Sequence, residues 1–335
     1  MADPRLDTVR LQRLSRSYRE AATLMAAVEV GLFTRVARGA DTLSRLTEAL
    51  GFTATNAERL VTACMALGLL VREGHRVRNA PDVQRYLVEG EPGYAGPWML
   101  FTKPEWDEWG RLAEHLRHTG PPAVLGKYAE GFTVKEARKY HEATYSIGMG
   151  SGRRFVRQVD LARRRRILDL GGGSGCYCIA ACQAHPQLSA VVFDLPPVAE
   201  VAREFIASNG LSERIATVGG DFTAAPLPAG ADVVIMASNL PQYSRDIIQP
   251  VIRKAWLTLE AGGEMHLIGE MLDAERTGPA DPALWGLAEA VYGSTGIAHS
   301  VTECVGYMEA AGFTGVTAQE FIPGVLIRVT GTKPA

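Results

Sequence analysis

The segment ILDLGGGSG at residues 167–175 constrains this chain more than any other part of it. A short apolar run containing Asp169 passes directly into a cluster of glycines and then into a helix-like stretch. Glycine adopts positive φ angles without steric cost and lets a ligand approach the backbone with no Cβ in the way. In open α/β sheets, ligands bind at the carboxyl ends of the strands. The segment therefore predicts a strand, a ligand-binding turn and a helix.

The pattern around this segment predicts a parallel sheet covered by helices. Apolar runs rich in β-branched residues alternate with helical stretches such as 198–208, which Gly210 ends. Such alternation is typical of doubly wound, Rossmann-like α/β folds. We expect strands at 167–170, 190–193, 215–218, 233–237 and 265–269, and a final strand pair within 321–330 around Pro323-Gly324.

The glycine pattern distinguishes between two classes of nucleotide ligand. The dinucleotide fingerprint requires Gly or Ala at its third position, but Cys176 stands there after Gly171 and Gly173. Gly171, Gly173 and Gly175, with Asp169 two residues before them, instead suit a nucleoside that has no pyrophosphate.

Acidic residues at the next two strand ends agree with a nucleoside ligand. Asp194, followed by Leu195, ends the second predicted strand, where a carboxylate can hold ribose hydroxyls. Asp221 and Phe222 follow the third strand. An Asp can accept a hydrogen bond from an exocyclic amine, and the neighbouring ring can cover an adenine face.

The first hundred residues predict a helical domain ending in a hairpin. Apolar residues recur at steps of three and four from Leu11 to Leu32, which predicts a helix packed either within its own domain or against a second copy. Thr53 or Thr55 can cap a later helix, and residues 69–78 read as two strands about Gly74. This order resembles a winged helix, so DNA binding is an alternative. The near balance of 35 basic against 37 acidic residues weakens that alternative.

The composition argues against a membrane protein, a disulfide-rich protein and a metal site. The 335 residues are 47% hydrophobic, and no stretch approaches the ~20 apolar residues of a membrane span or the core of a signal peptide, so we expect a cytoplasmic protein. Five cysteines at irregular spacing predict no disulfide framework. Cys176, Cys178 and Cys182 cluster, but no nearby histidine completes a metal site, so we expect no metal.

These motifs together resemble the class I S-adenosylmethionine (SAM)-dependent methyltransferases, and within them the caffeate/hydroxyindole-type O-methyltransferases. DLGGGSG at 169–175, FDLP at 193–196 and GDF at 220–222 are similar to the family's cofactor segments, and VGLF at 30–33 and LGLL at 67–70 to its dimerisation domain. The resemblance implies SAM as cofactor and a homodimer whose helical domain, residues 1–100, helps to close the partner's active site. It further implies connecting helices at 101–165, a catalytic domain at 166–335, and neither nucleic acid nor membrane as partner.

The sequence departs from that family at the general base. The family carries Leu-His-Asp-Trp after the fourth strand, whereas this chain has Leu-Pro-Gln-Tyr, which places Pro241 at the base position and Tyr243 shortly after it. Glu270 matches the family's first orienting Glu. Ala298 stands in place of the second, and His299 follows it.

The missing base allows two interpretations: either the base has moved to another position, or the methyl acceptor needs no base. Proline cannot accept a proton, whereas a thioether attacks through a lone pair and needs no base. The chain also resembles bacterial S-methyltransferases that methylate 4-methylthio-2-hydroxybutyrate in dimethylsulfoniopropionate synthesis, so S-methylation is our first expectation. Aromatic faces can stabilise the resulting cation, although core packing is the alternative for each ring. The candidate substrate residues are Tyr140, Tyr145, Met149, Trp285 and Tyr292.

Three other functions stay open. The first is O-methylation with a relocated base, either His299 or a tyrosine such as Tyr243. The second is C-methylation of an activated carbon. The third is a SAM-binding cyclase or regulator that transfers no methyl group.

Overall fold

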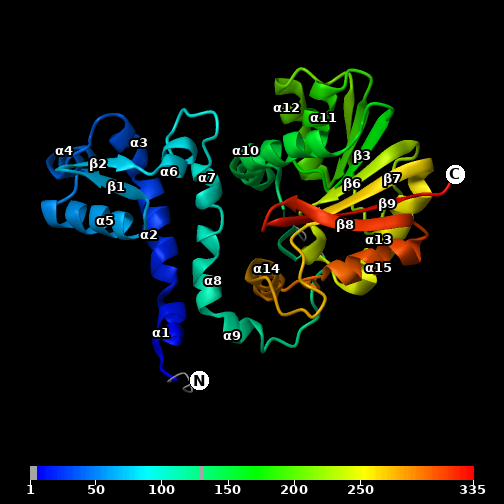
Figure 1. The fold of residues 1–335 in the computed structure, drawn as a ribbon. Coiled ribbons are helices and arrows are strands. Elements are labelled where there is room, and N and C mark those ends of the chain that lie inside the picture. Colours follow the sequence, from blue (N-terminus) through cyan, green and yellow to red (C-terminus); the bar gives the residue numbers. More distant parts are fainter. Residues whose placement is uncertain (1–5, 125, 129–131) are drawn as a thin grey trace, which may run out of the picture. The chain divides into compact units, whose positions relative to one another are not determined.

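The computed structural model describes residues 6–124, 126–128 and 132–335. The chain forms two compact units, the first ending at Trp106 and the second beginning at Asp107 (Figure 1). The second unit therefore includes most of the residues that we expected to connect two domains. Of the helices in the described ranges, none has the length and apolarity needed to cross a membrane.

The first unit is helical with one hairpin, as the sequence predicted. Thr53 caps α5 by accepting a hydrogen bond from the Asn56 amide at 3.2 Å. Arg76 and Arg78 of the hairpin form ion pairs with Asp41 and Glu73. The elements are α1 (Val9–Arg16), α2 (Tyr18–Glu29), α3 (Leu32–Ala37), α4 (Leu43–Leu50), α5 (Ala54–Ala66), β1 (Leu70–Glu73), β2 (Arg76–Asn79), α6 (Pro81–Tyr86), α7 (Gly96–Met99) and η1 (Lys103–Glu105).

The predicted apolar stripe divides into two halves that differ in burial. Met25, Val28 and Leu32 are buried, and Val28 and Leu32 belong to the hydrophobic core of the first unit. Leu14 and Tyr18, on and just after α1, are 65% and 63% exposed. The carboxyl half of the stripe thus packs within its own unit, and the amino half does not.

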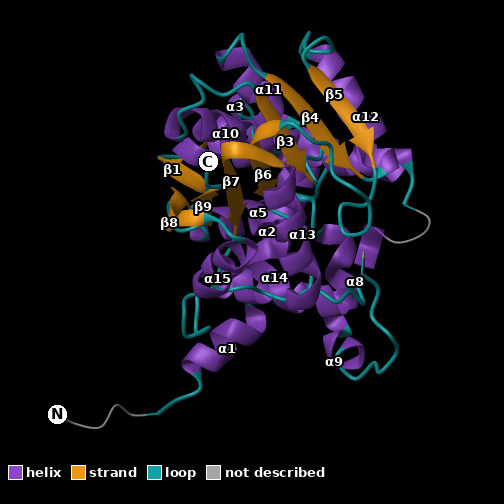
Figure 2. Cartoon of the chain, turned by 90° about the vertical axis from the view of Figure 1, so that its right-hand side faces the viewer, coloured by secondary structure: helices purple, strands orange, loops and turns teal. Residues whose placement is uncertain are grey.

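The second unit is built on a seven-stranded sheet in the order β5-β4-β3-β6-β7-β9-β8 (Figure 2). Strands β3 to β7 are parallel, and β9 and β8 are antiparallel additions, which confirms the doubly wound fold. The last pair is longer than predicted, because β8 begins at Thr314. The strands are β3 (Arg166–Leu170), β4 (Ser189–Asp194), β5 (Ile215–Gly219), β6 (Ala231–Ala237), β7 (Leu259–Gly269), β8 (Thr314–Ile322) and β9 (Leu326–Thr332).

Helices cover both faces of this sheet because successive strand residues point to opposite sides. Ile167 packs with residues of α10, α11 and α12, and Leu168 packs with residues of α13 and α15. The helices are α8 (Trp106–Gly110), α9 (Leu112–His115), η2 (Gly126–Tyr128), α10 (Val134–Gln158), α11 (Cys176–Ala184), α12 (Pro196–Ser208), η3 (Leu240–Gln242), α13 (Arg245–Thr258), α14 (Ala280–Val291) and α15 (Val301–Ala311).

Candidate active site

The glycine loop lies between β3 and α11, at the carboxyl end of the central strand. Gly171, Gly173 and Gly175 have φ angles of +67°, +55° and +76°, which side chains other than glycine rarely adopt. A Cβ on Gly171 would lie 2.3 Å from the Asn239 side-chain nitrogen, and one on Gly173 would lie 2.7 Å from the His141 ring. The predicted loop is therefore closed in by residues of two other segments.

Two predicted carboxyl groups lie beside this loop. Asp194 accepts hydrogen bonds from the amides of Gly173 and Leu195 at 2.8 and 2.7 Å, yet burial raises its pKa to about 6. Asp169 is only 1% exposed, and burial, followed by the charge of Asp194, raises its pKa to about 7. One Asp169 oxygen has Cys178 as a weak partner at 3.7 Å, and the other has none in the described part of the chain.

The third strand end supplies a carboxylate and an aromatic ring, as predicted. Asp221 accepts hydrogen bonds from the Thr223 amide and hydroxyl, at 2.8 and 2.7 Å. The Phe222 ring is buried, lies 5.3 Å from the Tyr243 ring, and would contact a Cβ placed on Gly171. The Lys254 ammonium donates to three backbone carbonyls of residues 222–225 and so fixes this turn.

Helix α10 brings aromatic side chains to the glycine loop. Only some of them were predicted from the sequence. Tyr140 lies edge-on to His141 at 4.9 Å and to Tyr128 at 6.1 Å between ring centroids. Burial lowers the pKa of His141 to about 4, so its imidazole is neutral at pH 7. Burial, then the charges of Asp194 and Asp221, raise the pKa of Tyr243. Tyr243 and Tyr140 thus lie in the site, and His141 and Tyr128 join them.

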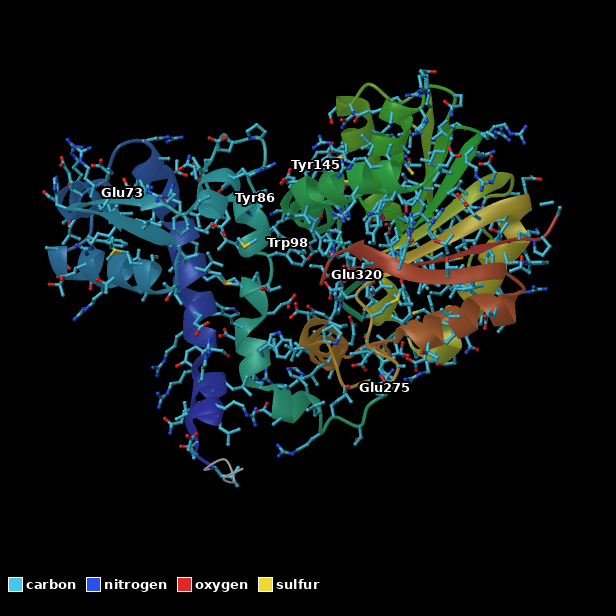
Figure 3. The ribbon with its side chains drawn as sticks, in the orientation of Figure 1. Glu73, Tyr86, Trp98, Tyr145, Glu275 and Glu320 are labelled. Atoms are coloured by element: carbon cyan, nitrogen blue, oxygen red, sulfur yellow. The ribbon has the colours of Figure 1, made fainter. Side chains whose placement is uncertain are left out.

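Two predicted substrate residues on α10 pack elsewhere. Tyr145, labelled in Figure 3, stacks on Phe205 of α12 at 4.5 Å, and its hydroxyl accepts a hydrogen bond from Asn209. Met149 is buried in the core between α10 and α11. The prediction that these two contact substrate is at odds with this packing, because a helix turns about 100° per residue and directs neighbours to different sides.

The remaining predicted substrate residues lie on and just after α14. Trp285 is half-buried on this helix, and Tyr292 is its half-buried C-cap. A Cβ on Gly126 would lie 3.6 Å from the Tyr292 Cβ, so the end of α14 adjoins the η2 segment that carries Tyr128.

His299 is fully buried, with both ring nitrogens engaged. Nε2 donates to the Tyr243 carbonyl at 2.9 Å, so Nδ1 accepts from the Tyr307 hydroxyl at 3.0 Å. Burial lowers its pKa. The prediction of His299 as a displaced base disagrees with this geometry, because neither nitrogen is available to a substrate. Its hydrogen bonds instead join α15 to the segment that follows η3.

Two glutamates lie near the position where the family's base was expected. Glu270 directly follows β7, and burial, then the charge of Asp281, raise its pKa to about 7. Glu289 of α14 is 3% exposed and accepts a hydrogen bond from the Ser294 hydroxyl at 2.5 Å. A Cβ on Gly296 would lie 2.3 Å from the Pro241 carbonyl oxygen and 2.7 Å from the Glu289 Cγ, so Pro241 and Glu289 flank Gly296. Sequence reasoning missed Glu289.

The cofactor that the resemblance implied fits the residues of this site. A ribose diol and an amino group are donors, and the orphaned Asp169 oxygen and the Asp194 carboxyl are acceptors beside the loop. The glycines leave room that any Cβ would fill. Among the described residues, no three His, Cys, Asp or Glu side chains are arranged to hold a metal ion.

Comparison with known proteins identifies the family of this chain. The O-methyltransferase domain matches residues 109–314, and the O-methyltransferase dimerisation domain matches residues 12–89. The chain is 34% identical over 321 residues to 3-hydroxy-5-methyl-1-naphthoate 3-O-methyltransferase of Streptomyces sahachiroi, covering 93% of this chain and 91% of that protein. It is 31% identical over 327 residues to the tetracenomycin polyketide synthesis 8-O-methyltransferase TcmO of Streptomyces glaucescens, covering 96% of each.

Among solved structures, human N-acetylserotonin methyltransferase in complex with SAM superposes with a TM-score of 0.82 at 24% identity, covering 100% of both chains, which shows the shared fold. The two domain matches and the 34% identity over nearly the whole chain decide the family. This chain belongs to the O-methyltransferase family of SAM-dependent enzymes.

Proposed function

We propose that this enzyme transfers a methyl group from SAM to a hydroxyl of an aromatic, polyketide-type small molecule. The observation that carries the proposal is the full-length similarity to two Streptomyces enzymes whose names specify O-methylation of a naphthoate and of a polyketide. Our first expectation, S-methylation of 4-methylthio-2-hydroxybutyrate, has no support among these relatives, and the alternative of O-methylation fits them better. The aromatic rings of Tyr128 and Tyr140 beside the loop suit a flat aromatic acceptor.

We assign roles to the candidate cofactor residues from their positions around the glycine loop. SAM supplies an electrophilic methyl group when it is bound. Asp194 takes the ribose hydroxyls, Asp221 and Phe222 take the adenine, and Asp169 accepts from the amino group. The glycines bring the backbone amides close to the ligand. The chain's contribution is alignment and exclusion of water, with reacting atoms ~3–3.5 Å apart.

A hydroxyl acceptor must lose a proton, and Glu289 is the residue that accepts it. The pKa of Tyr243 is raised, so that phenol stays protonated at neutral pH and serves as a hydrogen-bond donor. His299 has both nitrogens engaged, and His141 is a weak base because its pKa is lowered. Glu289 adjoins Pro241 across Gly296, and Ser294 orients its carboxylate. Glu270, with its pKa near 7, orients the substrate from the end of β7.

The enzyme works as a homodimer. The dimerisation-domain match covers α2 to α6 and the carboxyl half of α1. Leu11, Leu14 and Tyr18 form an exposed apolar stripe that suits a second copy. Leu14→Glu should shift the mass measured by light scattering toward that of a monomer. Leu257→Glu, at an exposed leucine of α13, should leave the mass unchanged.

The test of the activity is an S-adenosylhomocysteine (SAH) release assay. It compares hydroxynaphthoic acids and hydroxyanthraquinones with 4-methylthio-2-hydroxybutyrate. We expect turnover of the phenolic acceptors and none of the thioether. Turnover of the thioether alone would overturn the proposal, and absence of SAH release with every acceptor would favour a SAM-binding protein without transfer activity.

A further inference from the structure

A polar groove lies on the second unit at the opposite end of the sheet from the glycine loop. Arg163 and Arg164 come just before β3, whose carboxyl end carries the loop, and Glu264 pairs with Val233 near the start of β6. The groove has a volume of about 480 Å³, within the range of small-molecule sites. Its walls are the end of α10 and strands β7, β8 and β9, and the label on Glu320 marks β8 in Figure 3.

The charged side chains of the groove are predominantly basic. Three guanidinium groups, from Arg163, Arg164 and Arg328, face two carboxylates, from Asp160 and Glu264. Both carboxylates already have partners in the protein. Asp160 accepts a hydrogen bond from the Ala162 amide at 3.0 Å. Glu264 pairs with Arg164 at 3.0 Å and lies 3.2 Å from the ring of His266.

Arg328 is the residue that this network leaves incompletely paired. It is only 6% exposed, in the middle of β9. With the Gln319 carboxamide turned so that its oxygen faces the guanidinium, that oxygen accepts from Nε at 3.2 Å and also contacts Nη2. The buried Nη1 has no hydrogen-bond partner among the described residues. A buried donor of a charged group without a partner is costly, which favours an acceptor bound in the groove.

We propose that this groove is a second ligand site, which binds the phosphate or carboxylate group of a small molecule through Arg328 and Arg164. A guanidinium presents a planar set of donors that matches two oxygens of either group. Thr317 adds a hydroxyl group at the wall of the groove, and the buried ring of His266 lies behind it, with Nδ1 3.2 Å from the Thr330 hydroxyl. The remaining volume accommodates the rest of the ligand. We expect this groove to bind its ligand whichever methyl acceptor the enzyme uses.

The experiment measures thermal unfolding of the protein saturated with SAH, so that the methyl-transfer site is occupied throughout. Inorganic phosphate and malonate are titrated separately, with sodium chloride at matched ionic strength as the reference. A ligand that binds only the folded state raises the melting temperature in a saturable way. We expect a saturable rise with phosphate and also with malonate, because a carboxylate of malonate offers the same pair of oxygens.

Two variants test whether the rise in melting temperature comes from phosphate bound in the groove. Arg328→Met keeps most of the side-chain volume and removes the donors, and Thr317→Glu places a carboxylate at the exposed mouth of the groove without touching its buried part. Both should lose the phosphate response, with the apparent Kd rising at least tenfold. Arg157→Met, at an exposed arginine of α10 that does not line the groove, should retain it. A wild-type response no greater than that to chloride, or a response kept in both groove variants, would overturn the proposal.

Discussion

Replacing Glu289 by Gln tests the chemistry of this enzyme most directly. Gln has nearly the same shape, and its carboxamide oxygen can still accept the hydrogen bond from Ser294, so the fold should be retained. The substitution removes the proton acceptor. A positioned base contributes about 10²–10⁴-fold to the rate, equivalent to roughly 3–5 kcal/mol of transition-state stabilisation. We therefore expect kcat to fall by at least 100-fold, with little change in the affinity for SAH.

The assay is initial-rate SAH release across pH 6–9, with a hydroxynaphthoate acceptor that the wild-type enzyme turns over. Glu309→Gln, at an exposed glutamate of α15, is the matched control and should leave kcat unchanged. Glu270→Gln should raise KM more than it lowers kcat, because we assign Glu270 to substrate orientation. A Glu289→Gln enzyme with kcat within twofold of wild type would refute the assignment of Glu289 as the base. It would not refute O-methylation, which is tested separately by the turnover of phenolic acceptors by the wild-type enzyme.

Three further outcomes follow from the site. Asp194→Ala removes the acceptor of the Gly173 and Leu195 amides and should weaken SAH binding by about 10–100-fold in calorimetry; unchanged affinity would contradict its role. His299→Phe should lower the free energy of unfolding by about 2–4 kcal/mol but preserve the kcat of the folded enzyme, because both ring nitrogens serve the fold. The folded-state pKa of Asp169 is raised from 3.8 to about 7, so the protonated carboxyl favours folding, and this stability is lost as pH rises through about 7. The ligand-free protein should be less stable to urea at pH 8 than at pH 5, and Asp169→Asn should reduce the difference.

The positions of the candidate cofactor residues in the fold were predictable because each of their sequence signals is local. Gly171 and Gly173 need positive φ angles in a turn directly after an apolar strand, and Asp194 ends the next strand. In a parallel sheet, consecutive strand ends lie at one edge, so the order of elements alone brings these residues together. The strand positions followed from the same periodicity, although β7 and β8 both begin six or more residues before their predicted starts.

The catalytic side of the site was not predictable because it depends on tertiary packing. Glu289 lies in a helix among small and apolar residues, where a single acid is usually solvated, but α14 packs against η3 and α9 and Glu289 is buried. His299 follows the position of the family's second orienting Glu, which suggested a catalytic role, but its hydrogen-bond partner Tyr243 lies 56 residues away in sequence. Tyr145 lies five residues after Tyr140 on α10, and that spacing directs its ring toward α12 instead of the loop.

Pro241, Gly296 and Glu289 are best understood as a linked set. A proline at 241 leaves no proton acceptor on η3, and a glutamate on α14 can supply one only if the two segments approach closely. Gly296 permits this approach, because a Cβ there would lie within 3 Å of both. A base that approaches from α14 instead of η3 meets the acceptor from a different direction, so the hydroxyl that is methylated must be presented toward that helix. The position of the acceptor hydroxyl on its ring is therefore the feature of the substrate that this arrangement should select most strongly.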